Sequence, residues 1–366
     1  MLLEVTGTTG TTGTTGTTGT TGTTITGTIT TGTLLLELGR MDSHGFDTAV
    51  DLALPQRKAC FRVYETRRSQ GPLYVLHHGA GHSALSWVQL AAALLPTGST
   101  ITTEPTTTGS TTTDKVTLGP TNECSILCFD ARAHGLTTSE EEDIPLNVLA
   151  DDLAAIVNHL YPPPNRPDIV LVGHSLGGAV VVDVLTRSLI QGVRGVVVLD
   201  VVEGTALDSL SHMQRILLAR PKSFDSVQDA VKWAVYNNYS KNVKVAQVSI
   251  VNQLVQTASG KLVWRTDLHK TSEHWKGWFD NLSEKFLTVR AGRLLVLAGT
   301  DRLDKPLMIG QMQGKFQLAI YPESGHNIHE DTPHKLVTDL NEFWKRNQSL
   351  ATIKRFPIPP LKKSSC

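Results

Sequence analysis

Short runs of apolar residues recur along the chain, and stretches with helical spacing lie between them. The runs that predict fully buried strands are residues 73–77, 125–130, 169–172, 195–200, 293–298 and 317–321. Residues 61–66 instead alternate between apolar and polar side chains, as a half-buried strand does. Helical spacing occupies residues 83–95, 146–160 and 333–345, and a further helix runs on from Ala179. This alternation predicts an α/β fold with a mostly parallel sheet that helices cover on both faces.

The pattern changes between residues 204 and 287. Apolar residues there keep a helical spacing, among many Trp, Tyr and amide side chains, and no clear strand is visible. We therefore expect a helical cap at 204–287, inserted into one catalytic domain that covers residues 46–347. A central parallel sheet with a helical insertion is compatible with the α/β-hydrolase fold, which becomes the predicted fold class once the serine motif at residues 173–177 is taken into account.

Three stretches do not fit a packed domain. Residues 1–45 consist largely of a Thr/Gly repeat, which has little apolar surface to bury and is expected to be disordered. Residues 97–122 form a second Thr-rich segment, which we expect to be a surface insertion because it lengthens a connection that should be short. Residues 348–366 are expected to form a C-terminal tail.

The charge and cysteine content exclude several classes of protein. Lys plus Arg and Asp plus Glu both number 34, and this balance argues against electrostatic binding to nucleic acid or to a membrane. No apolar run approaches the ~18 residues that a membrane span needs. The chain has 4 cysteines, which we expect to be reduced thiols, and its first residues do not form a secretory leader. These observations predict an intracellular protein.

Residues 173–177 read Gly-His-Ser-Leu-Gly, a G-x-S-x-G match between a predicted buried strand and a predicted helix. In this setting the motif is typical of serine hydrolases, because the sharp turn exposes the serine hydroxyl above the sheet. The two glycines let the strand and the helix approach each other closely. Ser175 is therefore the predicted nucleophile. The competing interpretation is an ordinary glycine turn that contains a polar residue.

A serine nucleophile needs a base, and the base needs an orienting acid. In this fold the order along the chain is serine, acid, histidine, so His326 after the last predicted strand is the predicted base. Four other histidines fit this order less well: His77, His78, His134 and His174. The fold usually carries its acid after the strand that follows the cap, which indicates Asp301 or Asp304.

An enzyme of this kind also needs two backbone amides that stabilise the oxyanion. One is expected from Leu176, directly after the nucleophile. The other is expected from Ala80, with Gly81 as its neighbour, in the loop after the strand 73–77, where small residues let the backbone approach a substrate. The alternative for this loop is a plain glycine-rich turn.

Residues 326–331 read His-Asn-Ile-His-Glu-Asp and invite comparison with zinc sites. Their spacing matches neither H-E-x-x-H nor H-x-x-E-H, so no metal and no cofactor is expected. His329, Glu330 and Asp331 are instead expected at the approach to a helix and on the surface.

Beyond the serine motif, several blocks of the chain resemble the protein phosphatase methylesterase family. These blocks are residues 78–87, 200–208, 220–224, 277–279, 301–305 and 309–317. The resemblance runs from residue 61 to residue 344 and leaves out the Thr-rich tracts. Family members are serine esterases, so the resemblance implies the same fold that the hydrophobic pattern predicts.

The resemblance also implies a substrate and a set of site residues. The implied reaction is hydrolysis of the methyl ester on the C-terminal leucine of the protein phosphatase 2A catalytic subunit, in the cytoplasm or nucleus. The implied triad is Ser175, Asp200 and His326, so Asp200 competes with Asp301 for the role of the acid. Asp200 also ends a β-branched run, where a desolvated carboxylate would need a partner such as an imidazole N–H.

Two other functions remain open. A general carboxylesterase or lipase would have a broad apolar cap, whereas a methylesterase needs a cleft that admits a peptide tail. A non-catalytic inhibitor that grips the phosphatase would not need Ser175 and His326. The candidate liners of the cap are Trp233, Tyr236 and Trp278, and each of them could instead pack between the cap and the sheet.

Overall fold

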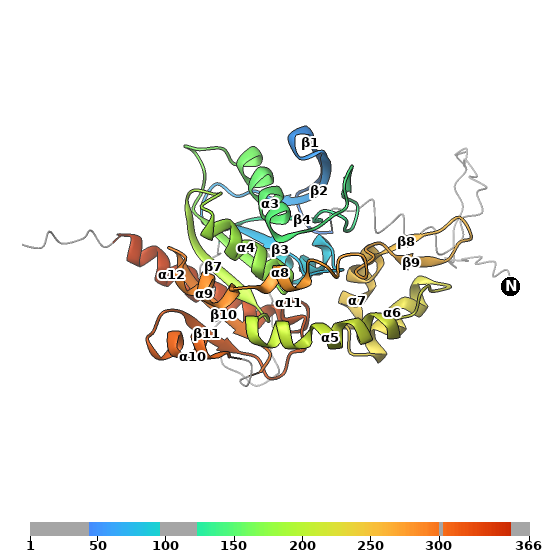
Figure 1. The fold of residues 1–366 in the computed structure, drawn as a ribbon. Coiled ribbons are helices and arrows are strands. Elements are labelled where there is room, and N and C mark those ends of the chain that lie inside the picture. Colours follow the sequence, from blue (N-terminus) through green and yellow to red (C-terminus); the bar gives the residue numbers. More distant parts are fainter. Residues whose placement is uncertain (1–43, 96–122, 300–302, 353–366) are drawn as a thin grey trace, which may run out of the picture.

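A computed structural model describes residues 44–95, 123–299 and 303–352, and its centre is a nine-stranded sheet (Figure 1). The strand order is β1-β2-β4-β3-β6-β7-β10-β11, and β5 pairs with β2. The strands are β1 (Thr48–Leu54), β2 (Ala59–Thr66), β3 (Leu73–His77), β4 (Ser125–Phe129), β5 (Thr138–Ser139), β6 (Ile169–His174), β7 (Val193–Leu199), β10 (Gly292–Leu297) and β11 (Gln317–Ile320). β2 runs antiparallel to its neighbours β1, β4 and β5. The six strands β4, β3, β6, β7, β10 and β11, which follow one another across the sheet, are parallel. The predicted α/β class is confirmed.

The central strands form where apolar side chains run without a polar interruption. Every residue of β3, β4 and β6 is buried, because a parallel strand with helices over both faces has no side that meets water. Successive side chains point to opposite faces. Leu171 accordingly belongs to one apolar cluster and Val172 to the other, on the far side of the sheet.

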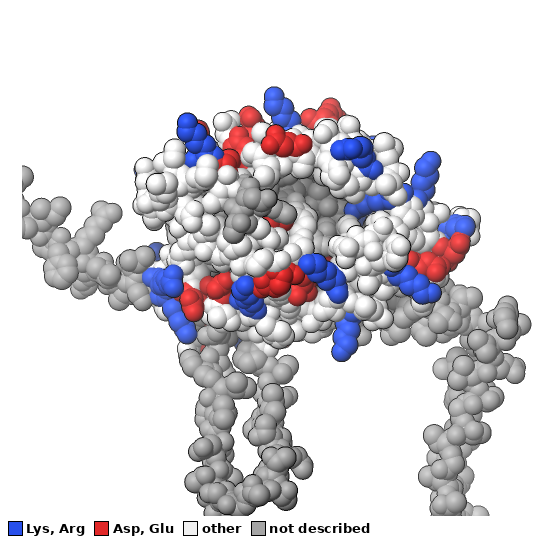
Figure 2. Space-filling view, turned by 90° about the horizontal axis from the view of Figure 1, so that it is seen from below, with Lys and Arg blue, Asp and Glu red and all other residues white. Residues whose placement is uncertain are grey.

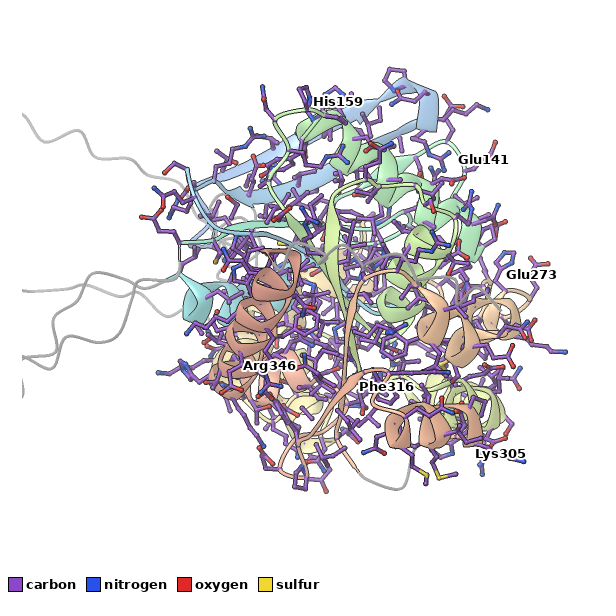
Figure 3. The ribbon with its side chains drawn as sticks, turned by 90° about the vertical axis from the view of Figure 1, so that its left-hand side faces the viewer. Glu141, His159, Glu273, Lys305, Phe316 and Arg346 are labelled. Atoms are coloured by element: carbon purple, nitrogen blue, oxygen red, sulfur yellow. The ribbon has the colours of Figure 1, made fainter. Side chains whose placement is uncertain are left out.

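Helices cover both faces of this sheet. Outside the cap they are α2 (Val88–Leu94), α3 (Leu146–Leu160), α4 (Leu176–Thr186), α10 (Lys305–Met312), α11 (Ile328–Asp331) and α12 (Pro333–Thr352), with the short 3₁₀ helices η1 (Pro55–Arg57) and η2 (Ala84–Trp87). α3 packs against α4, and α2 packs against α12. Figure 3 views these layers from the side, where Arg346 marks α12 and His159 marks α3.

The cap is inserted between β7 and β10. Its middle part extends from the sheet domain in Figure 1, whereas its last two helices pack against α4. Its elements are α5 (Glu203–Ala219), α6 (Val227–Tyr236), α7 (Val243–Ser249), η3 (Val251–Gln253), β8 (Leu254–Gln256), β9 (Leu262–Trp264), α8 (Trp275–Phe279) and α9 (Leu282–Thr288). Because β8 and β9 pair as an antiparallel hairpin, the expectation that this segment has no strand is wrong. The two strands are too short for their alternation to be recognised in the sequence.

Other expectations about the chain's organisation meet the structure only in part. α12 continues to Thr352, beyond the predicted domain end at residue 347. The Thr-rich segment 97–122 and most of the tract 1–45 lie outside the described residues, as does Asp301. In the described part of the chain, no helix is long and apolar enough to cross a membrane.

Candidate active site

Ser175 occupies a sharp turn between β6 and α4. Its backbone has φ 52° and ψ −119°, a conformation that costs energy for any residue with a side chain. A Cβ added to Gly173 would lie 2.1 Å from the carbonyl oxygen of Gly177, and one added to Gly177 would lie 2.2 Å from that of His77. A Cβ on Gly79 would lie 3.1 Å from the Ser175 Cβ. The turn therefore needs its glycines, and the loop after β3 passes directly beside the serine.

Asp200 and His326 come from the ends of different strands and form a hydrogen bond. Asp200 directly follows β7, His326 follows β11, and Oδ2 of the carboxylate lies 2.8 Å from Nδ1 of the imidazole. The other carboxylate oxygen accepts a hydrogen bond from the Ala298 amide at 2.9 Å. The Asp200 side chain is fully buried, whereas that of His326 is 52% exposed. Because the carboxylate accepts, Nδ1 carries the proton and Nε2 keeps its lone pair, as a general base requires.

The two other candidate acids do not share this position. Asp304 caps the N-terminus of α10, where its Oδ1 accepts from the Leu307 amide at 3.1 Å. Its Oδ2 accepts from the Ser283 hydroxyl at 2.6 Å. Asp301 lies outside the described residues. Of the carboxylates considered from the sequence, Asp200 is the one seen in contact with His326.

No hydrogen bond joins Ser175 to His326 in this conformation, in which the Ser175 hydroxyl has no hydrogen-bond partner among the described residues. Such bonds are often long in enzymes without substrate and shorten when substrate binds. Asp200 and His326 are therefore paired in this conformation, and the Ser175 hydroxyl is not joined to them.

Two backbone amides next to Ser175 are free to stabilise an oxyanion. Those of Ala80 and Leu176 have no acceptor among the residues that the structure describes. The amide of Gly81 differs, since it donates to Nε2 of His134 at 2.9 Å. The roles predicted for Ala80 and Leu176 remain predictions, and the geometry leaves both amides available for them.

His174 holds the loop that carries His326, a contact that was not predicted from the sequence. Its side chain is buried, and Nε2 donates a hydrogen bond to the backbone oxygen of His326 at 2.9 Å. Burial lowers its pKa well below the usual value, and the nearby His326 and His82 lower it further, so the ring is neutral. The cap holds the same loop, because the Asn327 side chain donates to the Tyr239 carbonyl at 2.7 Å.

His329 and Glu330 are buried, so the expectation that they lie on the surface is wrong. α11 turns its first residues inward beneath the cap, where the Ser249 hydroxyl donates to Glu330 at 2.6 Å. Burial raises the pKa of Glu330 to about 8 and lowers that of His329 well below its usual value. Asp331 is partly exposed and accepts from the Gly325 amide at 2.7 Å.

The three candidate liners of the cap lie in different environments. Tyr236 is 87% exposed. Trp278 is fully buried, and its indole donates to the Ile144 carbonyl at 2.9 Å, so it packs between the cap and the sheet domain. Trp233 packs against Phe224 within the cap.

The face seen from below in Figure 2 is hollowed near its centre, and α5 and α11, which follow Asp200 and His326, lie on that side in Figure 1.

The chain is similar to known proteins over most of its length. A model described as the alpha/beta hydrolase family matches residues 74–340. The relative named protein phosphatase methylesterase 1 from Schizosaccharomyces pombe is 42% identical over 312 residues, which cover 85% of this chain and 82% of the relative. The chain belongs to the protein phosphatase methylesterase family. Two further relatives carry the same name. The one from Yarrowia lipolytica is 44% identical, and the match covers 77% of this chain and 67% of the relative. The one from Homo sapiens is 35% identical, and the match covers 82% of this chain and 82% of the relative.

Solved structures confirm the α/β-hydrolase fold. E-2-(acetamidomethylene)succinate hydrolase superposes with a TM-score of 0.61 at 19% identity, covering 81% of this chain and 98% of the other. A Mycobacterium tuberculosis esterase has a TM-score of 0.58 at 16% identity, covering 87% and 100%. As a member of the methylesterase family with this fold, the protein is a carboxylic ester hydrolase, as the sequence predicted.

Proposed function

We propose that this esterase removes the methyl ester from the C-terminal leucine of the protein phosphatase 2A catalytic subunit, with Ser175, His326 and Asp200 as its triad. The observation that carries the proposal is the 2.8 Å bond between Asp200 and His326 at the strand ends beside the Ser175 turn. Membership of the methylesterase family supports the substrate. A cytoplasmic or nuclear location is part of the proposal and follows only from the resemblance to that family.

The acylation step uses the orientation that Asp200 gives to the imidazole. Nε2 of His326 takes the proton of the Ser175 hydroxyl while Oγ attacks the ester carbonyl carbon. The carbonyl oxygen becomes negative, and the amides of Leu176 and Ala80 donate hydrogen bonds to it. The tetrahedral intermediate collapses when the imidazolium returns its proton to the leaving methoxide, so methanol departs and an acyl-enzyme remains.

The deacylation step repeats this chemistry with water. His326 removes a proton from a water molecule, which attacks the acyl carbon, and the Ser175 oxygen leaves with the proton from the imidazolium. The products are a free C-terminal carboxylate and the regenerated serine. The buried Asp200 carboxylate stays ionised throughout and stabilises the imidazolium that forms in each half-reaction.

A competition assay tests this proposal. The purified protein receives the methylated phosphatase subunit and a long-chain lipid ester together, and mass spectrometry follows both products. We expect the phosphatase ester to be cleaved faster by wild-type protein, and neither ester to be cleaved by Ser175→Ala. A serine-reactive fluorophosphonate should label the wild-type protein and spare the variant.

Each alternative function has its own result in this assay. Faster cleavage of the lipid ester would indicate a general lipase and contradict the proposal. Equal inhibition of phosphatase activity by wild-type protein and by Ser175→Ala, with the methyl ester intact in both, would indicate a binding protein without chemistry.

A further inference from the structure

A buried polar cluster lies between the loops that carry Ala80 and His326. It consists of His82, His329 and Glu330, called the His82 cluster below, and each of the three is at most 5% exposed. One possible ligand atom from each residue lies within 4.8 Å of the other two. None of the three belongs to the proposed triad or oxyanion amides, so the proposed reaction gives the cluster no role.

Four polar side-chain atoms of the His82 cluster lack hydrogen-bond partners among the described residues. Among the described residues, Nδ1 of His82, both ring nitrogens of His329 and Oε2 of Glu330 have no hydrogen bond. A buried polar atom without a partner costs roughly 1–3 kcal/mol. Four such atoms on three neighbouring side chains indicate a site that is built to bind a ligand.

A chain of hydrogen bonds with the cap determines which ring nitrogen of His82 is left without a partner among the described residues. The side-chain amide of Gln253 is oriented by its Nε2, which donates to the Ser249 carbonyl at 3.2 Å. Its Oε1 therefore accepts from the Tyr239 hydroxyl at 2.8 Å. The Tyr239 oxygen, having donated its proton, accepts from Nε2–H of His82 at 3.3 Å. Nδ1 of His82 consequently carries a lone pair, and no described residue uses it.

The same chain of hydrogen bonds orients the carboxyl group of Glu330. The Ser249 hydroxyl donates to its Oε1 at 2.6 Å and accepts from the Gln253 amide at 3.3 Å. Only Oε2 is left open. Histidine and carboxylate ligands of metal ions are held in this way, with the atom that does not bind the metal engaged by a second residue.

We propose that His82, His329 and Glu330 bind one divalent transition-metal ion, for which Zn²⁺ is the best fit. Two imidazole nitrogens and one carboxylate oxygen are a donor set that zinc favours in tetrahedral sites, with a fourth position left for water.

An ion at this position would connect the two loops that the proposed reaction uses. His82 follows Ala80 by two residues, and His329 follows His326 by three. The ring of His329 also packs against that of His174, with centroids 4.6 Å apart, and His174 holds the His326 backbone oxygen. The ion would therefore tie the loop of Ala80 to the loop of His326.

Metal binding to the purified full-length chain tests the inference. The protein is treated with a chelator, dialysed and titrated with Zn²⁺ by calorimetry, and the loaded protein is studied by X-ray absorption spectroscopy. We expect one zinc per chain, with two imidazole nitrogens and one carboxylate oxygen at about 2.0–2.1 Å. We expect His329→Gln and Glu330→Gln each to weaken binding more than a hundredfold. Tyr239→Phe, which removes the partner of His82, should weaken it roughly 10–100-fold.

Two control variants separate this site from adventitious binding. His274→Asn disrupts a second, more exposed group of possible ligands that also contains Asp143 and Glu273, and Glu273 lies at the outer edge in Figure 3. His159→Gln removes an exposed histidine of α3, also labelled there. Both variants should bind zinc like the wild type. Ser175→Ala should too, so the outcome is independent of the proposed esterase activity.

Several results would overturn the proposal. One is less than a tenth of a zinc ion per chain after titration, which would mean that the cluster holds water only. Another is an unchanged affinity in both His329→Gln and Glu330→Gln. If these variants do not fold, the absorption spectrum of the wild-type protein still decides, because fewer than two imidazole ligands excludes the site.

Discussion

Ser175 and His326 are held in place in two different ways. The Ser175 turn is fixed by backbone packing, since a single added Cβ at Gly177 would meet the His77 carbonyl at 2.2 Å. The His326 side chain is 52% exposed and donates a hydrogen bond to Asp200, while His174 donates one to the His326 backbone oxygen. The position of Ser175 is thus set by close backbone packing between the turn and the end of β3, whereas the position of the His326 side chain depends on hydrogen bonds with side chains from other segments. The two should respond differently to substitution.

The largest effect is expected at the turn itself. Ser175→Ala removes the attacking oxygen while keeping the backbone that the glycines define, so kcat should fall about 10⁶-fold with little change in thermal stability. Demethylation kinetics and a melting curve measure the two quantities. Activity within tenfold of the wild type in a folded variant would show that Ser175 is not the nucleophile.

The next effect concerns the loop of the base. Asp200→Asn should lower kcat roughly 10⁴-fold, because an amide no longer fixes the imidazole tautomer. Asp304→Asn is the matched control, since Asp304 caps α10 and contacts Ser283 instead of His326. It should stay within tenfold of the wild-type rate.

Asp301→Asn completes this series, because the sequence left Asp301 open as the acid. We expect it to stay within tenfold as well. A collapse in Asp301→Asn together with a nearly normal Asp200→Asn would overturn the assignment of Asp200.

A stability measurement probes how tightly the turn is packed. Gly177→Ala should destabilise the fold by about 3 kcal/mol or more, since the new methyl group meets backbone atoms that cannot move aside. Gly277→Ala in α8 is the control, because nothing lies within 4 Å of its Cβ position, and alanine there should be neutral or slightly stabilising. Denaturant unfolding of the two variants gives the comparison. Equal stabilities would mean that the turn is not as tightly constrained as its geometry indicates.

The pH dependence of stability probes the buried histidines next to the turn. Burial lowers the pKa of His77 and of His134 to about 4, below the usual value near 6.5. Between those two pH values the unfolded chain binds protons that the folded protein excludes, so stability falls as pH falls from 6.5 towards 4. Each histidine contributes a loss of about 1.4 kcal/mol per pH unit in that range.

Denaturant unfolding at pH 7.5 and pH 5.5 measures this loss, and His77→Gln should show a smaller one than the wild type. The same pH dependence in both proteins would contradict the assignment to His77.

The smallest effect is expected from the N-terminus. Deleting residues 1–40 should leave both the demethylation rate and the melting temperature unchanged. This segment lies outside the described residues, and its Thr/Gly composition offers few side chains that could bury apolar surface or ionise. A large loss of rate in a well-folded truncation would give the tract a role that its composition does not indicate.

The sequence by itself determined the parts of this protein that depend on neighbours along the chain. Uninterrupted apolar runs such as β3 and β6 identify buried strands, and the glycines around Ser175 predict a tight turn, because both signals are local. The family blocks identified the esterase class. The hairpin of β8 and β9 was missed, since strands of three residues carry almost no periodic signal.

Only the tertiary structure decided which distant residues meet. Asp200 and His326 are 126 residues apart. Asp200 and Asp301 both follow predicted strands that end at the same edge of the sheet, so sequence order could not show which of them is the acid. His329 and Glu330 have polar side chains that favour the surface in isolation. They are buried because α11 is held between the sheet domain and the cap, and their neighbour His82 comes from a different loop. Local pattern cannot show such contacts, because they depend on how the elements pack together.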